Sequence, residues 1–532
     1  MKKIVVYDTT LRDGAQTYGV DFSVSDKRVL FAAMDKIGFD YIEGGWPGAN
    51  PVDDAFFSDL PKAKRAAVTT FGMTHRADKK AEEDQAFLNL FQANTKAVTL
   101  VGKTWDFHVK VALGISKERN LELIRDSVAF GVKQGKEVLF DAEHFFDGYK
   151  ANPEYALSCL KAAKEAGATW LVLCDTNGGL LPDEIYTIVC DVKGKVPFEQ
   201  YGIHSHDDTG NAVANSLAAV RAGCLMVQGT LNGLGERCGN ANLLTVIPNL
   251  MLKMDLKTNL SMDDLKGLTS LSHLLNERLG QAPFKYSPYV GEAAFTHKAG
   301  LHVSALVKNS ALYEHISPEV VGNNRRILVS SQAGKSNVLA MLRTIGVDPD
   351  TLDKKVVTSL LDQVKKSSME GLTYDGAEAS FELLVREILG EIPNYFQLTS
   401  FRVVDERRYN ALGKLVISSD ATCRVMIGDQ SYLEAADGEG PVDALGNALQ
   451  KTLLPIYPEL ADLKLYDYKV RILSAEKGTA AVPRVMIESG DSSGKRWSTV
   501  GASVDVIDAS FKALLDSFIY KLYLAGVPSR QM

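Results

Sequence analysis

The sequence predicts an α/β fold with an N-terminal (β/α)8 TIM barrel, mostly helical linker subdomains and a C-terminal α+β domain with an internal repeat. In the first 250 or so residues, short β-rich runs alternate eight times with helix-period segments. The pattern is then mostly helical, and from about residue 400 three strands followed by a helix occur twice. At 532 residues the chain exceeds the size of one core, so several domains are expected.

The eight predicted barrel strands are short apolar runs, each followed by polar residues. Their ranges are 4–10, 41–46, 66–73, 97–103, 137–143, 169–176, 201–206 and 225–230. Helices are expected between them, such as 25–37 with Ser25 as N-cap and 116–134 with Ser116 as N-cap. In such barrels the active site lies at the C-terminal ends of the strands, so the polar residues there are the candidates for function.

Three domains are expected from these changes in pattern along the sequence. The barrel takes residues 1–260, the linker 261–398 and the last domain 399–532. In the linker we expect helices over 263–279 and 350–366. In the last domain we expect strands within 411–434 followed by a helix over 441–452, and strands within 465–505 followed by a helix over 506–523.

Charge and composition favour a small-molecule substrate. The net charge is −7 and no block of basic residues appears, which argues against nucleic acid or an anionic membrane as the main partner. No run reaches about 18 apolar residues, so neither a membrane span nor export is indicated, and a cytoplasmic location is expected. The six cysteines show no CxxC pair, which favours reduced thiols.

Three strand ends offer ligands for one metal ion. His204 and His206 project from the same face of an extended chain, Asp13 follows the first strand, and Asn240 follows the eighth. This mixed oxygen and nitrogen set suits a six-coordinate divalent ion such as Mg²⁺, Mn²⁺ or Zn²⁺. Two open positions would accept a 2-oxo acid through its ketone and carboxylate oxygens. The alternative is a purely structural histidine pair.

Arg12 precedes the expected ligand Asp13 at the end of the first strand. A guanidinium beside a metal-bound ketone can stabilise the alkoxide that forms when carbon attacks the carbonyl. The alternative for Arg12 is a salt bridge at the barrel rim.

Several strings of the sequence occur together in one enzyme family. They are Asp8-Thr-Thr-Leu-Arg-Asp-Gly14, His204-Ser-His206, Gly235-Glu-Arg-Cys-Gly-Asn240 and Phe295-Thr-His-Lys-Ala-Gly-Leu-His302. With the doubled C-terminal unit, the chain resembles the acyl-CoA-condensing synthases of the isopropylmalate and homocitrate synthase family over essentially its whole length. Three further strings look like the citramalate synthase branch: Gly102-Lys-Thr-Trp-Asp-Phe-His108, Phe140-Asp-Ala-Glu-His-Phe-Phe-Asp-Gly148 and Tyr374-Asp-Gly-Ala-Glu-Ala-Ser-Phe-Glu382.

This resemblance implies roles for further residues. His302 would be the base that deprotonates the acetyl thioester, with Tyr313 as its partner, both reaching the site from a second subunit. Glu143 would be the catalytic glutamate that orders Arg12 and the enolate. Other implied roles are binding of the oxo-acid carboxylate by Thr176 and backbone approach to the CoA thioester at Gly233 and Gly235. His297 is an alternative base, and Glu143 could merely pair with Lys103 or Arg12.

The implied reaction is a Claisen-type condensation of acetyl-CoA with pyruvate, followed by thioester hydrolysis, in a homodimer. The C-terminal domain would be regulatory, with isoleucine as feedback inhibitor. The alternatives are an isopropylmalate or homocitrate synthase using another 2-oxo acid, and a metal-dependent lyase or aldolase on the same barrel. A metabolite sensor without turnover is a third possibility.

The sequence departs from the family pattern at two positions. Ser304 stands where some members carry an acid two positions beyond the base histidine. Asp141, two positions before Glu143, is not an apolar group that would wrap a methyl, so Trp105 or Met73 is expected to line that pocket instead. Cys238 is expected to be a packing residue.

Overall fold

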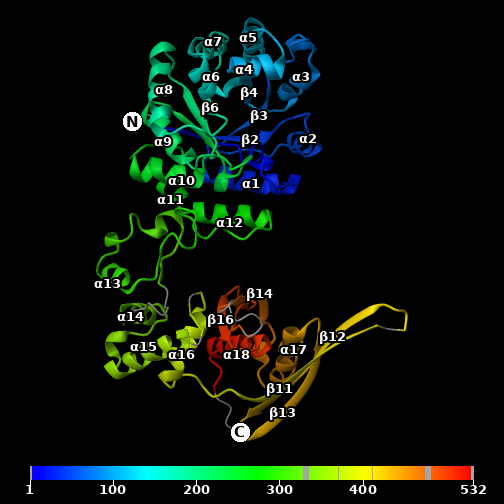
Figure 1. Cartoon of the computed structure of the whole chain (residues 1–532), viewed down its shortest axis with the longest axis vertical. Helices are drawn as coiled ribbons and strands as arrows, with labels where there is room; N and C mark the ends of the chain where they lie inside the picture. Colours follow the sequence, from blue (N-terminus) through cyan, green and yellow to red (C-terminus); the bar gives the residue numbers. More distant parts are fainter. Residues whose placement is uncertain are drawn as a thin grey trace. The chain divides into compact units, whose positions relative to one another are not determined.

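A computed structural model describes residues 3–327, 335–369, 371–374, 376–409, 411–473 and 481–528. It forms two compact units (Figure 1). The first contains residues 1–295 and 316–324, and the second contains residues 296–315 and 325–532. Asp375, inside one of the three branch-specific strings, lies outside the described residues.

The first unit is a closed barrel of eight parallel strands in sequence order. The strands are β1 (Val5–Asp8), β2 (Tyr41–Gly45), β3 (Ala67–Met73), β4 (Ala97–Lys103), β5 (Glu137–Glu143), β6 (Trp170–Asp175), β7 (Tyr201–Ser205) and β8 (Met226–Gly229). Pairing of β1 with β8, in register from Val5 opposite Met226, closes the barrel. The predicted fold class is confirmed, and every predicted strand is present within two residues of its expected ends.

Helices surround the strands, as Figure 1 shows. They are α1 (Val24–Ile37), α2 (Pro51–Ser58), α3 (Gln85–Gln92), α4 (Asp106–His108), α5 (Lys117–Lys133), α6 (Phe145–Ala151), α7 (Pro153–Glu165), α8 (Pro182–Lys195), α9 (Ala212–Arg221) and α10 (Leu243–Pro248). Apolar side chains between helices and strands form the main core of this unit. Strand residues such as Tyr7, Leu139 and Met226 form a smaller buried cluster.

The start of α1 differs from the prediction. Its N-cap is Ser23, not Ser25: the Ser23 hydroxyl accepts from the Asp26 N–H, and the Asp26 carboxylate accepts from the Ser23 N–H. A serine three residues before an acid can exchange both hydrogen bonds, which makes a capping box, and Ser25 lies too close to Asp26 to do so. Ser116 caps α5 as predicted, by accepting from the Arg119 N–H.

The region after the barrel is mostly helical, as predicted. Its helices are α11 (Met262–Leu265), α12 (Leu268–Arg278), α13 (Gly300–Lys308), α14 (Lys335–Thr344), α15 (Lys354–Met369) and α16 (Glu378–Ile388), with the short pair β9 (Thr296–His297) and β10 (Arg326–Ile327). The prediction of a single helix over 263–279 is wrong, because the structure has two helices there, separated by Lys266 and Gly267. The helix expected from 350 begins at Lys354, after Asp353 accepts from the Lys355 N–H.

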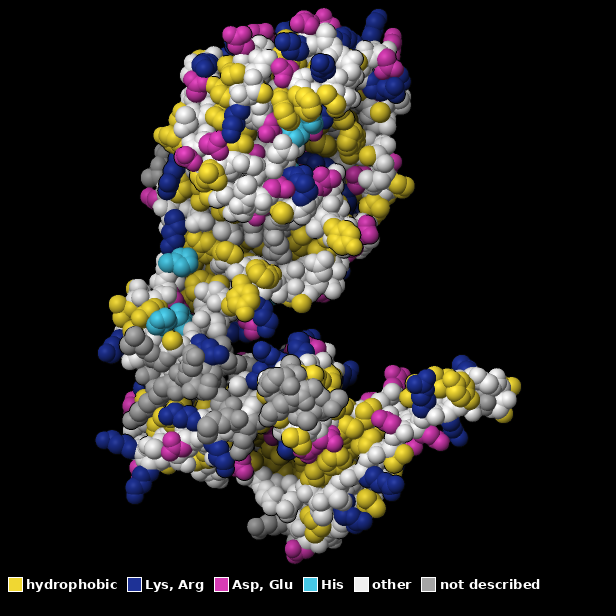
Figure 2. Space-filling model, viewed as in Figure 1, with side chains coloured by type: hydrophobic (Ala, Val, Ile, Leu, Met, Phe, Trp, Pro, Cys, Tyr) yellow, Lys and Arg dark blue, Asp and Glu magenta, His cyan; other side chains and the backbone are white. Residues whose placement is uncertain are grey.

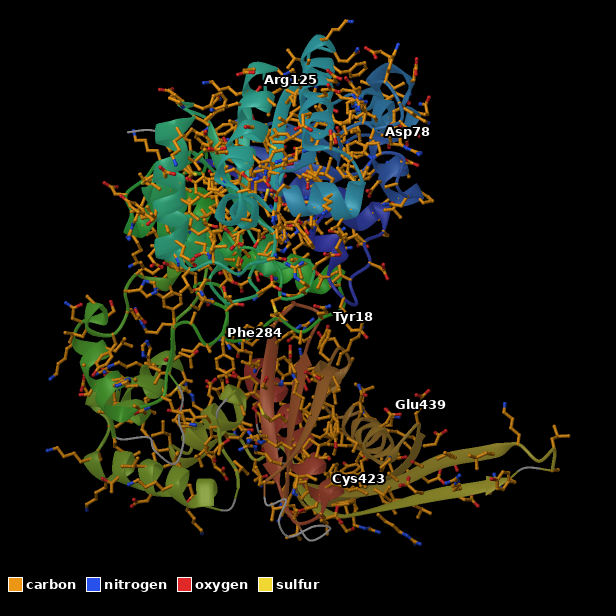
Figure 3. The ribbon with its side chains drawn as sticks, turned by 45° about the horizontal axis from the view of Figure 1, so that its top comes forward. Tyr18, Asp78, Arg125, Phe284, Cys423 and Glu439 are labelled. Atoms are coloured by element: carbon orange, nitrogen blue, oxygen red, sulfur yellow. The ribbon has the colours of Figure 1, made fainter. Side chains whose placement is uncertain are left out.

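The C-terminal part of the second unit contains the predicted repeat. Strands β11 (Gln397–Tyr409), β12 (Leu415–Ile427) and β13 (Gln430–Gly438) precede α17 (Pro441–Leu453), and strands β14 (Lys464–Ile472), β15 (Pro483–Gly490) and β16 (Arg496–Ala502) precede α18 (Val506–Leu524). Both sheets are antiparallel. Their shared core includes Cys423 of β12 (Figure 3). Three strands before each helix were expected, but the predicted range 411–434 left out β11, because its exposed charged run 405–408 carries no apolar alternation.

The surface carries mixed charge. Figure 2 shows basic and acidic side chains interspersed over the visible face of both units. None of the described helices is both long enough and apolar enough to cross a membrane.

Candidate functional site

Three ionisable side chains meet at the C-terminal ends of β1 and β7. The Nε2 atoms of His204 and His206 lie 3.3 Å apart, and Asp13 Oδ2 lies 3.5 Å from His204 Nε2. The extended strand β7 places both imidazoles on one face, and the turn after β1 holds Asp13 because its N–H donates to Thr9 O at 2.8 Å. One ligand atom from each residue lies within 4.8 Å of the others.

Asn240 completes this group from the loop after β8. It pairs with His206 as an isolated bridge, and its N–H donates to Gly233 O at 3.1 Å. The loop can fold this tightly because Gly239 has φ +96° and a Cβ there would lie 1.9 Å from Gly233 O. The side-chain nitrogen of Asn240 donates to Leu234 O, whereas its Oδ1 is buried with no hydrogen-bond partner among the described residues.

The electrostatics of this group suit a cation. Burial alone would raise the pKa of Asp13, but the positive charge of Arg12 contributes most to bringing it below its usual value. Burial lowers the pKa of His204, and burial together with His204 lowers that of His206 to about 4. At neutral pH the group is therefore one carboxylate and two neutral imidazoles, which is the protonation state that metal binding requires.

The residues present fit a divalent metal ion. An unpaired amide oxygen in a buried position normally costs stability, and a bound cation would satisfy the one on Asn240. Two imidazole nitrogens, one carboxylate oxygen and the Asn240 amide oxygen make a donor set of four protein atoms, which leaves coordination positions open for a substrate.

Arg12 lies beside this group with its guanidinium fixed from three sides. Its Nε donates to Glu43 Oε2 at 2.7 Å, one of its terminal nitrogens lies 3.3 Å from Asp13 Oδ2, and its Cζ lies 3.7 Å from the centroid of the Phe71 ring. Burial opposes the charge of Arg12, but Glu43 and Asp13 outweigh it and raise the pKa of Arg12 above its usual value. Arg12 is therefore a permanent, oriented cation.

Besides Asp13, the carboxylate that contacts Arg12 is that of Glu43, in the middle of β2. We expected Glu143 to have that role, but the structure pairs Glu143 with Lys103 instead. Glu43 is fully buried, and Tyr7 Oη and Thr9 Oγ1 donate to its two oxygens. The sequence analysis missed Glu43, because it lies within β2 and its partners Tyr7 and Arg12 come from β1 and the turn after β1.

Thr176 and Glu143 lie at neighbouring strand ends. The N–H of His144, which follows Glu143 and has φ +52°, donates to Thr176 Oγ1 at 2.8 Å. Among the described residues, no group accepts the Thr176 hydroxyl hydrogen, which is therefore available for an acceptor in the cavity. The left-handed backbone of His144 is uncommon for a residue with a side chain, and such conformations concentrate at functional sites.

A cavity of about 240 Å³ joins these groups. It is lined by Arg12, Asp13, Gln16, Trp46, Phe71, Met73, Val101, Lys103, Asp141, Glu143, Cys174, Thr176, His204, His206, Glu236 and Arg237. Met73 therefore lines the cavity, and Trp105 lines a separate pocket beside Asp147. The sequence analysis also missed Trp46 and Phe71. Burial raises the pKa of Asp141 to about 8.

The two candidate bases lie in the second unit and differ in their surroundings. The His302 side chain is exposed, and its ring stacks on Tyr313 with centroids 4.2 Å apart. His297 Nε2 lies 3.3 Å from Glu314 Oε1, and that buried carboxylate also accepts from Arg325. The structure thus brings His302 and Tyr313 together as the resemblance implied, while His297 belongs to an ion-pair cluster.

Two smaller expectations have different outcomes. Cys238 was expected to pack, but it is exposed, because the loop that carries it turns outward before Asn240. Gly233 and Gly235 both have positive φ and lie in the same loop, so their backbone borders the metal-binding group through Asn240.

Comparisons with known proteins cover nearly the whole chain. The HMGL-like family model matches residues 3–272, a homocitrate synthase post-HMGL domain-like model matches 289–371, and a LeuA allosteric (dimerisation) domain model matches 375–522. The chain is 48% identical to an "(R)-citramalate synthase" of Geobacter sulfurreducens over 98% of both chains. It is also 48% identical to that of Aquifex aeolicus, over 98% of both chains.

A more distant relative and a solved structure also match the chain. The chain is 43% identical to the "(R)-citramalate synthase" of Sulfolobus acidocaldarius, over 98% of this chain and 97% of the relative. A Bacillus subtilis HMG-CoA lyase structure is 20% identical with a TM-score of 0.47, covering 55% of this chain and 97% of that one, a likeness too distant to inform the site.

Removing one ligand should weaken metal binding strongly without unfolding the chain. We expect His206→Ala to weaken Mn²⁺ binding, measured by calorimetry, by on the order of 100-fold or more, because one of the donor atoms is lost. The exposed His273 of α12 supplies the control, since His273→Ala should bind Mn²⁺ like the unchanged protein. Equal affinity of the His206→Ala and unchanged proteins, with both folded by circular dichroism, would contradict the assignment.

Proposed function

The chain belongs to the (R)-citramalate synthases of the HMGL-like family, and from this we propose how its barrel condenses acetyl-CoA with pyruvate and hydrolyses the thioester to give (R)-citramalate and CoA. The observation that carries the function is the 43–48% identity to five (R)-citramalate synthases over nearly the full chain. The enzyme is an acyltransferase, because an acetyl group moves from CoA to the oxo acid and becomes part of its carbon skeleton.

A divalent metal, Mg²⁺, Mn²⁺ or Zn²⁺, would be held by Asp13, His204, His206 and the Asn240 oxygen. The depressed pKa values of the histidines and the unpaired Asn240 Oδ1 support this proposal. When bound, it would supply Lewis-acid polarisation of the pyruvate ketone. The other residues of the cavity then provide binding, orientation and charge stabilisation.

Arg12 is proposed to stabilise the negative charge that develops on the ketone oxygen. Glu43, Asp13 and the Phe71 ring hold its guanidinium in place, so little reorganisation is needed as charge develops. Thr176 is proposed to donate its hydroxyl hydrogen to the pyruvate carboxylate, because it lines the cavity and no described group accepts that hydrogen. Together they would orient the ketone carbon for attack.

Glu143 is proposed to act on the acetyl side of the cavity. Its carboxylate is paired with Lys103 on the neighbouring strand β4, so both charges are fixed at the cavity wall. In this position Glu143 can help to order the enolate of acetyl-CoA. Gly233 and Gly235 are proposed to let the backbone approach the thioester, since neither carries a side chain that would block the rim.

His302 is proposed as the base that removes the proton from the acetyl methyl group. Its exposed ring, supported by Tyr313, is accessible to a substrate. His297 is a poorer candidate because Glu314 accepts both its hydrogen bond and that of Arg325. As the family resemblance implies, a second subunit is proposed to supply His302. The matched dimerisation domain supports a homodimer.

The oxo-acid preference tests the function directly. We expect acetyl-CoA to release free thiol fastest with pyruvate, and much more slowly with 2-oxoisovalerate or 2-oxoglutarate, because Met73 and Trp46 bound a small cavity. A thiol reagent monitors the reaction, and Arg12→Gln protein is the background control. Faster release with either larger acid would assign another synthase, and cleavage of citramalyl-CoA without condensation would assign a lyase.

The Arg12 assignment predicts a specific change in kinetics. Arg12→Lys should lower kcat by on the order of 100-fold with a smaller change in the KM for pyruvate, because lysine cannot keep the contacts with Glu43 and Asp13 while facing the ketone oxygen. Steady-state kinetics measure both constants. A raised KM with an unchanged kcat would make Arg12 a residue of substrate binding alone.

Shared active sites predict complementation between inactive subunits. Arg12→Gln and His302→Ala proteins, each inactive alone, should regain partial activity when mixed, since one kind of hybrid site keeps both side chains. His297→Ala in place of His302→Ala separates the two candidate bases, because it should retain turnover by itself. Mixed dimers verified by mass spectrometry that show no activity would refute subunit sharing.

Isoleucine is proposed as the feedback inhibitor that binds the C-terminal domain. The match to a LeuA allosteric (dimerisation) domain model and the repeated βββα unit support this role. We expect millimolar isoleucine to inhibit more than leucine does, and protein ending near residue 395 to lose this response. A coupling of about 1–3 kcal/mol is typical of such effects. No heat of isoleucine binding in calorimetry of the full chain would show the domain to be structural.

A further inference from the structure

Two buried residues lie behind His204, on the side away from the other metal ligands, and we propose that Gln228 and Asp141 are positioning residues that keep His204 in its metal-binding form. The inference rests on the metal site proposed above. It concerns side chains of strands β8 and β5, which no comparison assigns to the site.

The three side chains form a continuous chain of hydrogen bonds across the barrel. His204 Nδ1 lies 3.0 Å from Gln228 Oε1, and Gln228 Nε2 donates to Asp141 Oδ1 at 3.0 Å. All three are buried, with exposed fractions of 5%, 1% and 4% respectively. The opposite ring nitrogen of His204, Nε2, is the atom that faces Asp13 and His206.

The direction of these hydrogen bonds fixes the tautomer of His204. In the structure the Gln228 amide nitrogen donates to Asp141 Oδ1, and the amide oxygen faces His204 Nδ1. An amide oxygen accepts, and therefore the hydrogen of the neutral imidazole lies on Nδ1. The lone pair then lies on Nε2, directed at the other ligands, as a metal requires.

Asp141 is the far end of this series of hydrogen bonds and orients the Gln228 amide. Among the described residues, no lysine or arginine forms a salt bridge with this buried carboxyl. Its hydrogen bond with Gln228 holds in either protonation state, because a carboxyl group keeps an accepting oxygen in both. Without Asp141, the Gln228 amide could turn and direct its nitrogen toward His204.

Mn²⁺ affinity, measured by calorimetry on the full chain, tests the inference without requiring turnover. Gln228→Met removes the partner of His204 and nearly keeps the side-chain volume, and Asp141→Leu removes the acceptor that orients Gln228. We expect each to weaken Mn²⁺ binding about 10- to 100-fold. Asp141→Asn keeps an accepting oxygen at the same place, and its affinity for Mn²⁺ should stay within about threefold of that of the unchanged protein.

The double variant distinguishes a chain of contacts from two independent effects. If Asp141 acts through Gln228, the Asp141→Leu and Gln228→Met double variant should bind Mn²⁺ about as weakly as Gln228→Met alone. Once Gln228 is replaced, no hydrogen bond links Asp141 to His204, so removing Asp141 as well should have no further effect on metal affinity. Additive losses would overturn the inference, since they would mean that Asp141 acts elsewhere.

A matched control separates these effects from general destabilisation. Asp35 is also a buried barrel carboxyl, but it accepts from the N–H groups of Lys64, Arg65 and Ala66 before β3, at the other end of the strands. Asp35→Asn should leave Mn²⁺ affinity unchanged. Equal affinity of the unchanged, Asp141→Leu and Gln228→Met proteins would refute the positioning role alone. Absence of Mn²⁺ binding in the unchanged protein would refute the metal site and this inference with it.

Discussion

Closure of the eight-stranded barrel is the constraint on which the site depends. Hydrogen bonds between β1 and β8 bring the first and last strands together, so residues more than 200 positions apart share one rim. Asp13 from the first strand end, His204 from the seventh and Asn240 after the eighth can face one point only in a closed barrel. The packed ring of helices keeps that geometry rigid, because its core leaves the strands little freedom.

Buried charge is the second element of the site. Glu43 lies beneath the rim, where Tyr7 and Thr9 donate to it, and it orients Arg12 from below. Desolvating these groups costs free energy, and the folded barrel offsets that cost with paired charges and hydrogen bonds. The result is a cation and a neutral histidine pair whose orientations are set before substrate arrives, which is the condition for strong electrostatic stabilisation of a developing alkoxide.

Much of this arrangement was predictable from the sequence, and the remainder depended on contacts between distant strands. The eight strands and the residues at their ends follow from local alternation and from motifs such as His204-Ser-His206. Glu43 and Gln228 could not be assigned that way, since their importance arises from partners on other strands. Local errors had local causes. Ser23 and Ser25 are both suitable N-cap residues near the start of α1, and the charged run in β11 lacks the apolar alternation from which a strand is predicted. The domain boundaries and the catalytic roles remain predictions.

The central claim is that four side chains from three strand ends form one metal site next to Arg12. Anomalous diffraction from crystals grown with Mn²⁺ and pyruvate tests it most directly. The account predicts one strong anomalous peak within bonding distance of Asp13 Oδ2, the Nε2 atoms of His204 and His206, and Asn240 Oδ1, with pyruvate oxygens completing the coordination. A peak elsewhere, or pyruvate bound in the cavity without an ion beside these side chains, would contradict it.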